Sequence, residues 1–291
     1  MKKTILALFV SLLILSCGEI PPFVDFSEPI LLARDTTYIT NDIPSNALKN
    51  VLLEDISGVN CNNCPKAAKI AHDIQNNNDP GRVVVMTLHP KTYPQYTAPH
   101  PDSKDTFNTQ EATDIMSSLL GEPRGFPAGA VDRKLFDGFQ TKLLSEYNAW
   151  PTYVNQQLAL PSKADLDLTV LREGERTVIA NVKTTFLEAD ATPVYISVFI
   201  VESHIISRQT MPAKPTDNYD YEHNSILREG VTLWSGLLLA KSVEKGRVFE
   251  KGFKFELPNR YVMENCSIVV LINKNDKQST EVLQCIEKPI K

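Results

Sequence analysis

Cys61 and Cys64, with only two residues between them, are the pair with the clearest chemical potential in this chain. Residues 51–56 are mostly apolar and predict a buried strand before the pair, and residues 64–76 carry alanine and isoleucine at helical spacing. Two cysteines at the first turn of a helix can form a disulfide, and the positive helix end favours a thiolate there. This placement predicts Cys61, nearer the loop, as the exposed nucleophile and Cys64 as the resolving thiol that releases a substrate.

The pattern leaves three interpretations of this pair open: a redox-active disulfide, an inert disulfide and a metal site. A zinc site needs further sulfur or imidazole ligands at compatible spacing, whereas Cys266 and Cys285 lie far along the chain. Three histidines are closer in sequence, but each alone is more typical of a surface or a strand end: His72, His89 and His100. Redox use is the favoured interpretation, and neither a metal nor a cofactor is predicted.

The elements around the pair predict a parallel α/β unit. A stop signal at residues 76–81 ends the predicted helix, and residues 83–88 form a continuous apolar run typical of a central parallel strand. Strand, helix and strand in this order form a βαβ unit. A long proline-rich insertion at residues 89–108 follows, and residues 109–120 have a helical pattern.

Pro127 precedes a further apolar strand at residues 127–131. The order of strand, cysteine pair, helix, strand, helix and proline-led strand resembles the thioredoxin fold, in which this proline is cis and lies beside the disulfide. Only about 5% of X–Pro bonds are cis in general, but the order of elements predicts a cis bond at Phe126–Pro127. The candidate catalytic residues are therefore Cys61, Cys64 and Pro127.

The pattern changes after Pro161, where strand-like segments follow one another without intervening helices. Several strands in succession without helices between them favour an antiparallel sandwich. The predicted fold class is an α/β thioredoxin-like domain at residues 48–160, followed by an all-β, sandwich-like antiparallel domain at residues 161–291. The predicted strands of the second domain are residues 166–171, 177–185, 194–201, 249–256, 267–272 and 280–286.

The N-terminus has the form of a secretory signal, with Lys2 and Lys3 before an apolar run at residues 5–15. A spanning helix needs about twenty apolar residues, so this run is too short to cross a bilayer. Residues 14–17 resemble the lipobox of bacterial lipoproteins. This predicts removal of signal peptide 1–16 and attachment of lipid, with acyl chains such as palmitate, to Cys17. The alternative is an ordinary signal peptide with a chance cysteine.

Residues 17–47 are rich in proline and predict a tether between lipid and domain, with one short strand near residues 31–39. Gly18 stands where an aspartate retains lipoproteins at the inner membrane of enteric bacteria. The outer membrane is therefore the expected location, and the membrane face is left open.

The two remaining cysteines, Cys266 and Cys285, flank a turn-like stretch at residues 273–280. A hairpin there would set them nearly opposite each other, which predicts a structural disulfide in an exported protein. Two buried free thiols are the alternative. The net charge is −5 and no basic stripe is present, so no nucleic-acid partner is expected.

Together these motifs resemble the family of twenty-eight-kilodalton outer-membrane proteins, which are lipoproteins mainly of Bacteroidetes. The resemblance implies a thioredoxin-like domain and a β-rich C-terminal domain, but no settled activity. Asn60 departs from the tryptophan of thioredoxins, and Pro65 follows the second cysteine. The stretches that carry the resemblance are residues 54–58, 61–65, 84–89, 125–129, 133, 201–202, 209, 221–228 and 234–236.

Two functions follow from these patterns. The first is a membrane-anchored lipoprotein that is redox active through Cys61 and Cys64 and exchanges with a thiol-bearing protein partner. The alternative is a non-catalytic envelope lipoprotein, for binding or structure, that uses the thioredoxin fold as a scaffold. The polar cluster at residues 221–224 would line a binding surface under the alternative, although such clusters more often cap an element and hold a loop.

Overall fold

The computed structural model describes residues 32–103, 105–212, 217–276 and 278–291. Both the signal at 1–16 and Cys17, the predicted lipid attachment site, lie outside the described residues. None of the described helices is both long and apolar enough to cross a lipid bilayer.

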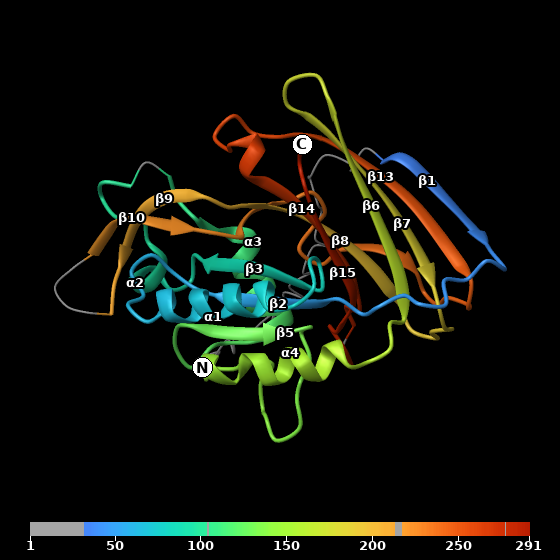
Figure 1. The fold of residues 1–291 in the computed structure, drawn as a ribbon, viewed down its shortest axis with the longest axis horizontal. Coiled ribbons are helices and arrows are strands. Elements are labelled where there is room, and N and C mark those ends of the chain that lie inside the picture. The colour runs from blue at the N-terminus through green and yellow to red at the C-terminus, as the bar shows by residue number, and fades with distance from the viewer. Residues whose placement is uncertain (1–31, 104, 213–216, 277) are drawn as a thin grey trace, which may run out of the picture.

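The first part of the chain folds around parallel strands β2 and β3, in which Val51 lies opposite Val83 (Figure 1). Strand β5 pairs with the other edge of β2 in antiparallel orientation. The predicted βαβ unit is present. The elements are β2 (Val51–Ile56), α1 (Cys64–Asn76), β3 (Val83–Pro90), α2 (Pro94–Thr97), β4 (Asn108–Thr109), α3 (Gln110–Ile115) with a π-helical turn (Met116–Leu120), β5 (Ala128–Val131), a 3-10 turn (Tyr147–Ala149) and α4 (Trp150–Leu158).

Alternating side chains of β2 enter two different cores, which explains why its whole sequence is buried. Leu53 packs with α1 and α4, whereas Leu52 and Ile56 pack with α3. Helix α1 turns its buried face, with Ala67 and Ala71, toward the sheet. The sheet thus fixes the position of the first turn of α1, where the cysteine pair lies.

The second part is built almost entirely of strands, as predicted. A four-stranded sheet has the order β1-β13-β7-β6, and a second sheet contains β15, β14 and β8. The elements are β6 (Ala164–Glu173), β7 (Thr177–Phe186), β8 (Val194–Glu202), β9 (Ile205–Thr210), β10 (Asp217–His223), β11 (Ile226–Gly230), β12 (Leu237–Ala240), β13 (Arg247–Glu256), a 3-10 turn (Met263–Asn265), β14 (Cys266–Asn273) and β15 (Val282–Pro289).

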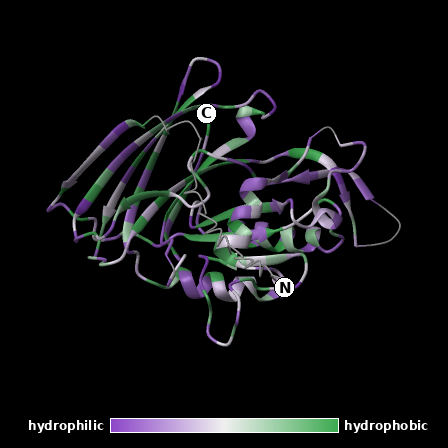
Figure 2. Ribbon diagram, turned by 180° about the vertical axis from the view of Figure 1, so that it is seen from behind, coloured by the Kyte–Doolittle hydropathy of each residue, from purple (hydrophilic) through white to green (hydrophobic). Residues whose placement is uncertain are grey.

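An apolar core fills the space between these two sheets and confirms the predicted sandwich-like arrangement. Val178 of β7 and Phe253 of β13 pack there with Val198 of β8 and Ile268 of β14. Hydrophilic and hydrophobic residues alternate along the four-stranded sheet, as expected for strands with one face on a core (Figure 2).

Strand β1 (Leu32–Ile39) confirms the short strand predicted within the tether, and it adds a role for that strand. It pairs with β13 in antiparallel register, with Tyr38 opposite Val248. This part of the 17–47 segment is therefore a sheet strand and not a free linker.

One continuous sheet includes strands from both sides of the predicted boundary near residue 160, with the order β15-β14-β8-β11-β3-β2-β5. The join is made by Ile226 of β11, which lies opposite Thr87 of β3, and by a hydrogen bond of 2.7 Å from Thr87 N to Ser225 O. The division into two domains stays a prediction. The join brings residues 221–226 next to β3 and to the cysteine pair.

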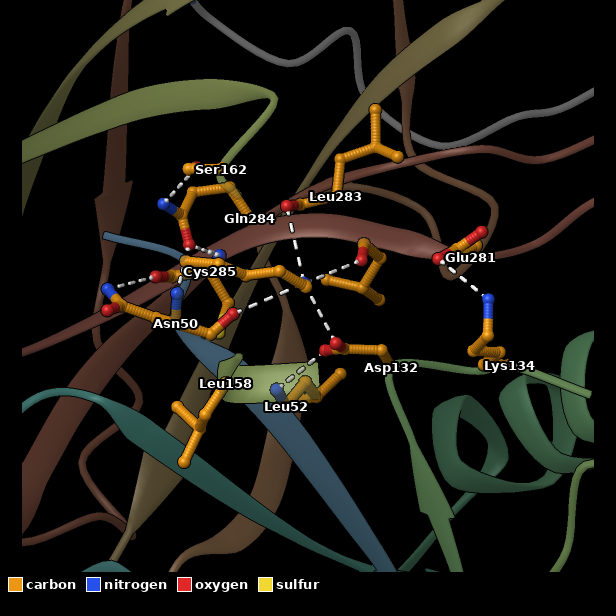
Figure 3. A network of polar contacts seen from close by, with 12 residues as sticks. Asn50, Leu52, Asp132, Lys134, Leu158, Ser162, Glu281, Leu283, Gln284 and Cys285 are labelled. Atoms are coloured by element: carbon orange, nitrogen blue, oxygen red, sulfur yellow. Dashed lines mark hydrogen bonds and ion pairs between the residues drawn. The ribbon is translucent and has the colours of Figure 1, made fainter. Parts of the chain in front are cut away.

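A buried polar network also links the start of β2 to β15 (Figure 3). Lys49 Nζ lies 2.8 Å from a carboxyl oxygen of Asp132 and donates to Val282 O at 3.3 Å. Gln284 accepts a hydrogen bond of 2.8 Å from Asn50 N. Although burial raises the pKa of Asp132 to about 6, the nearby Lys49 acts in the opposite direction.

The predicted disulfide between Cys266 and Cys285 is corrected by the structure, which holds both as free, buried thiols. In the β14–β15 hairpin, Cys285 lies opposite Leu271, so Cys266 is offset from it by about 16 Å at roughly 3.3 Å per residue. The two side chains also enter different cores on opposite faces of the sheet. Burial raises the pKa of Cys266 to about 12 and that of Cys285 well above its usual value, so both are inert thiols.

Gly129 in β5 allows Trp150 to pack against the sheet, because a Cβ there would lie 2.4 Å from the indole ring. We expect Gly129→Ala to lower the free energy of unfolding by about 1–3 kcal/mol through overpacking. The matched control is Gly125→Ala, where a Cβ meets nothing within 4 Å. Urea unfolding of the two variants measures the difference, and equal midpoints would contradict the packing argument.

Candidate functional site

Cys61 and Cys64 form a disulfide at the junction of the β2 loop and α1, with their Cα atoms 5.4 Å apart. Cys64 is the first residue of α1, and its amide donates to Cys61 O at 3.2 Å. Pro65 fits the first helical turn because its missing N–H would have no partner within the helix. The strand–helix placement predicted for the pair is confirmed.

Cys61 is not the exposed nucleophile that the sequence predicted, since both cysteines are only 2% exposed. The insertion after β3 covers one side of the loop, where Asn60 N donates to Tyr96 O at 2.8 Å. A Cβ on Gly58 would lie 2.2 Å from the same oxygen, so glycine permits this close approach. The insertion is therefore packed directly on the disulfide loop.

Strand β9 covers the loop from a second side. Thr210 N donates to Val59 O at 2.9 Å, and Gln209 Nε2 donates to Cys61 O at 3.1 Å. Gln209 itself is buried. A segment some 150 residues farther along the chain thus closes the site over Cys61.

The Phe126–Pro127 bond is cis, as predicted. The Phe126 ring stacks on that of Tyr96 with ring centres 4.8 Å apart. Because the backbone of Tyr96 also contacts the disulfide loop, this residue connects the loop with the proline segment. The catalytic role assigned to Pro127 stays a prediction.

A cavity of about 470 Å³ lies between α1, β3 and the β9–β10 hairpin, and Cys64 is part of its wall. We call it the Cys64 cavity. Cys61 is not among the residues that line it. The polar cluster predicted either to bind or to hold a loop contributes Tyr221, His223 and Asn224. The wall of the cavity also includes Ala68, Lys69, His72, Thr87, His89 and Ser225.

Asp55 of β2 is a functional candidate that the sequence analysis missed. It lies opposite Thr87 in β3, and both Thr87 and the nearby Ser57 line the Cys64 cavity. The Asp55 side chain is fully buried, and none of the described residues hydrogen-bonds to its carboxyl oxygens. Burial raises the pKa of Asp55 to about 7. An aspartate within an apolar strand was the available sequence signal.

His89 and His223 both pack against Phe107, with ring centres 5.7 and 4.8 Å from the phenylalanine ring. Burial, with the charges of His223 and Arg228, lowers the pKa of His89 to about 3. Burial lowers the pKa of His223 to about 4. Both rings are therefore neutral at pH 7, and His89 Nδ1 and His223 Nε2 lack hydrogen-bond partners among the described residues.

The structure also places the other predicted histidines. His72 lines the Cys64 cavity with His89, whereas His100 lies under the disulfide loop, with its Nε2 3.3 Å from Val59 O. Within the described ranges, no group of three or more histidine, cysteine, aspartate or glutamate side chains is arranged to hold a metal ion. The site thus combines a covered disulfide, one cysteine at a cavity wall, and neutral polar groups around that cavity.

Comparison with known proteins adds four findings. A family model described as "Outer membrane protein Omp28" matches residues 122–291, a span that does not include the cysteine pair. The solved structure of HBP35 of Porphyromonas gingivalis has a TM-score of 0.65 at 15% identity, covering 85% of this chain and 77% of that one, and thus shares the fold. No curated protein matches the chain.

A domain of the outer membrane lipoprotein Omp28 from Porphyromonas gingivalis is also similar, with 17% identity over 45% of this chain and 90% of that one. Its TM-score of 0.30 is too low to support an argument about arrangement.

Proposed function

Because the chain belongs to the Omp28 family of outer membrane proteins, we propose that it is a lipid-anchored outer-membrane protein that exchanges thiols and disulfides through Cys61 and Cys64. The anchor in this proposal is lipid on Cys17. The proposal includes a thioredoxin-like domain at residues 48–160 and a sandwich-like domain at residues 161–291.

The arrangement of β2, α1, β3 and β5 supports the thioredoxin-like assignment. The first two strands are parallel, the cysteine pair opens the helix between them, and β5 runs antiparallel to β2 directly after the cis Pro127. The sequence around Asn60 differs from that of thioredoxins, so the fold alone does not set the potential of the disulfide.

The observation that carries the redox proposal is the position of Cys64 in the wall of a cavity lined by both apolar and polar side chains, with Asp55 buried beneath the same face of the sheet. Reduction of a disulfide requires proton uptake by the sulfurs. A carboxyl group with a pKa near 7 can give or accept a proton at neutral pH, and such shifted groups are typical of functional sites.

The Cys64 cavity also supports a second candidate, in which the fold is a scaffold that binds a polar ligand. His89 Nδ1 and His223 Nε2 are buried and have no hydrogen-bond partner in the part of the chain that the structure describes, so a ligand could satisfy both. This candidate expects binding to survive the double change Cys61→Ser, Cys64→Ser.

A redox titration tests the first proposal. The full lipoprotein in detergent is equilibrated at pH 7 with mixtures of reduced and oxidised dithiothreitol, alkylated, and analysed by mass spectrometry. We expect a reversible two-electron transition with a midpoint above about −300 mV, because structural disulfides lie below that value.

The double variant Cys61→Ser, Cys64→Ser is the matched control, since it retains the buried thiols of Cys266 and Cys285 and reports their background alkylation. A midpoint below about −300 mV, in the range of structural disulfides, or a disulfide that does not re-form, would overturn the redox proposal.

A further inference from the structure

We infer that the reaction partner of this disulfide is a small polar thiol that enters the Cys64 cavity and attacks Cys64, in place of a protein thiol that attacks Cys61. The inference rests on the proposed redox function and specifies its substrate class. It also reverses the roles that the sequence assigned to the two cysteines.

Access is the first argument. A thiolate must reach the sulfur that it attacks, and the rate of exchange depends on this access. Both cysteines are only 2% exposed, but Cys64 forms part of the cavity wall, whereas Cys61 does not and lies under contacts from Tyr96, Gln209 and Thr210. A thiol on a folded protein would have to displace α2 or β9 to reach Cys61.

The leaving group is the second argument. Attack on Cys64 expels Cys61, which lies in the turn immediately before α1. The positive end of a helix lowers the pKa of a nearby thiol, and a thiol of lower pKa leaves faster. Attack from the cavity side therefore expels a thiolate that lies close to the positive end of α1.

The walls of the cavity define the chemistry of the partner. Neutral His89 and His223, together with Thr87 and Tyr221, offer hydrogen bonds without a net charge. Lys69 and Glu222 add one charge of each sign to the lining. At about 470 Å³ the cavity falls in the size range of small-molecule sites. A zwitterionic or uncharged thiol fits this lining, and free cysteine is a suitable probe.

The exchange balances in two steps. The thiolate of the small molecule forms a bond to Cys64 Sγ as the Cys61–Cys64 bond breaks, and Cys61 takes the electron pair and the proton that the incoming thiol lost. A second small thiol then attacks the sulfur of the bound molecule and releases the small disulfide, leaving Cys64 as a thiol. Two small thiols are oxidised and the protein disulfide is reduced.

Trapping the first step tests which sulfur is attacked. The oxidised full lipoprotein is mixed with excess cysteine, quenched with acid, and mapped by peptide mass spectrometry. We expect the cysteinyl adduct on Cys64. As a second measurement, reduced Cys61→Ser should form a mixed disulfide with cystine about tenfold faster than reduced Cys64→Ser, because only Cys64 borders the cavity. An adduct on Cys61, or equal rates, overturns the inference.

Blocking the cavity tests the route. Ala68 lines the cavity on α1, whereas Lys66 on the same helix is exposed and does not line it. We expect Ala68→Phe to slow reduction by cysteine about tenfold without changing the equilibrium midpoint, and Lys66→Phe to leave the rate unchanged. Reduced thioredoxin serves as the protein-thiol probe and should react more slowly than cysteine at equal thiol concentration.

The outcomes separate the two proposals. If the disulfide cannot be reduced and re-formed, the redox function itself fails. If it is reversible but Ala68→Phe has no effect, or thioredoxin outpaces cysteine, only the small-thiol inference fails.

Discussion

Replacing Arg133 with methionine is expected to lower the free energy of unfolding by about 3–5 kcal/mol, the usual cost of breaking a buried ion pair. Arg133 and Glu54 are both fully buried. The guanidinium donates from Nη2 to Glu54 Oε1 at 2.7 Å and from Nε to both carboxyl oxygens at 3.1 Å. Without the arginine, the Glu54 carboxylate is left in the core without a counter-charge.

The double variant Glu54→Leu, Arg133→Met should recover most of the loss, because apolar residues of similar volume often replace a buried pair at little cost. The exposed pair of Lys163 and Glu188 provides the matched control, and Lys163→Met should cost no more than about 1 kcal/mol. Urea unfolding of all three variants gives the comparison. If the Arg133→Met variant had the same free energy of unfolding as the parent, Glu54 would not depend on Arg133 as its counter-charge, and the prediction would be wrong.

Replacing Asp55 with asparagine is expected to stabilise the protein at pH 8 by about 4 kcal/mol and to leave its stability unchanged near pH 4. Burial raises the pKa of Asp55 from 3.8 to about 7, so the folded state binds the proton more tightly than the unfolded chain. The stability that the protonated Asp55 contributes is fully present below 3.8, the pKa of this group in the unfolded chain. It is lost as the pH rises through about 7, the pKa of Asp55 in the folded protein. Asparagine stays neutral and removes this loss.

The measurement is urea unfolding of Asp55→Asn and the parent at several pH values between 4 and 8. Differences between the two proteins cancel the contributions of His89, His223 and other groups that titrate in the same range. The exposed Asp167→Asn serves as control, with an expected change within about 0.5 kcal/mol at each pH. A pH-independent difference for Asp55→Asn would contradict a raised pKa in the folded state.

The same variant connects stability with function. If the buried carboxyl handles the proton during exchange, Asp55→Asn should be more stable and slower in reduction by cysteine at pH 7. A gain in stability with a loss of activity is common when a destabilising group is removed from an active site.

Local patterns were sufficient to predict several features of this protein. The apolar run of β2, the periodic alanines of α1 and the position of Pro127 depend on near neighbours in the chain, and they predicted the disulfide, the helix and the cis bond. Strand alternation predicted the sandwich for the same reason, since it reports which side of each strand is buried. The resemblance to the outer-membrane family also followed from such motifs.

Contacts between distant segments decided the rest. Tyr96 and Gln209 bury Cys61, and the join of Ile226 to Thr87 brings the β9–β10 hairpin to the cavity wall. The offset between Cys266 and Cys285 depends on hairpin register, which alternation alone does not set. The sequence by itself determined that the cysteine pair lies at the start of α1, because strand and helix patterns are local. Only the tertiary structure decided that Cys64, and not Cys61, borders a cavity, because that depends on which remote segments pack over the loop.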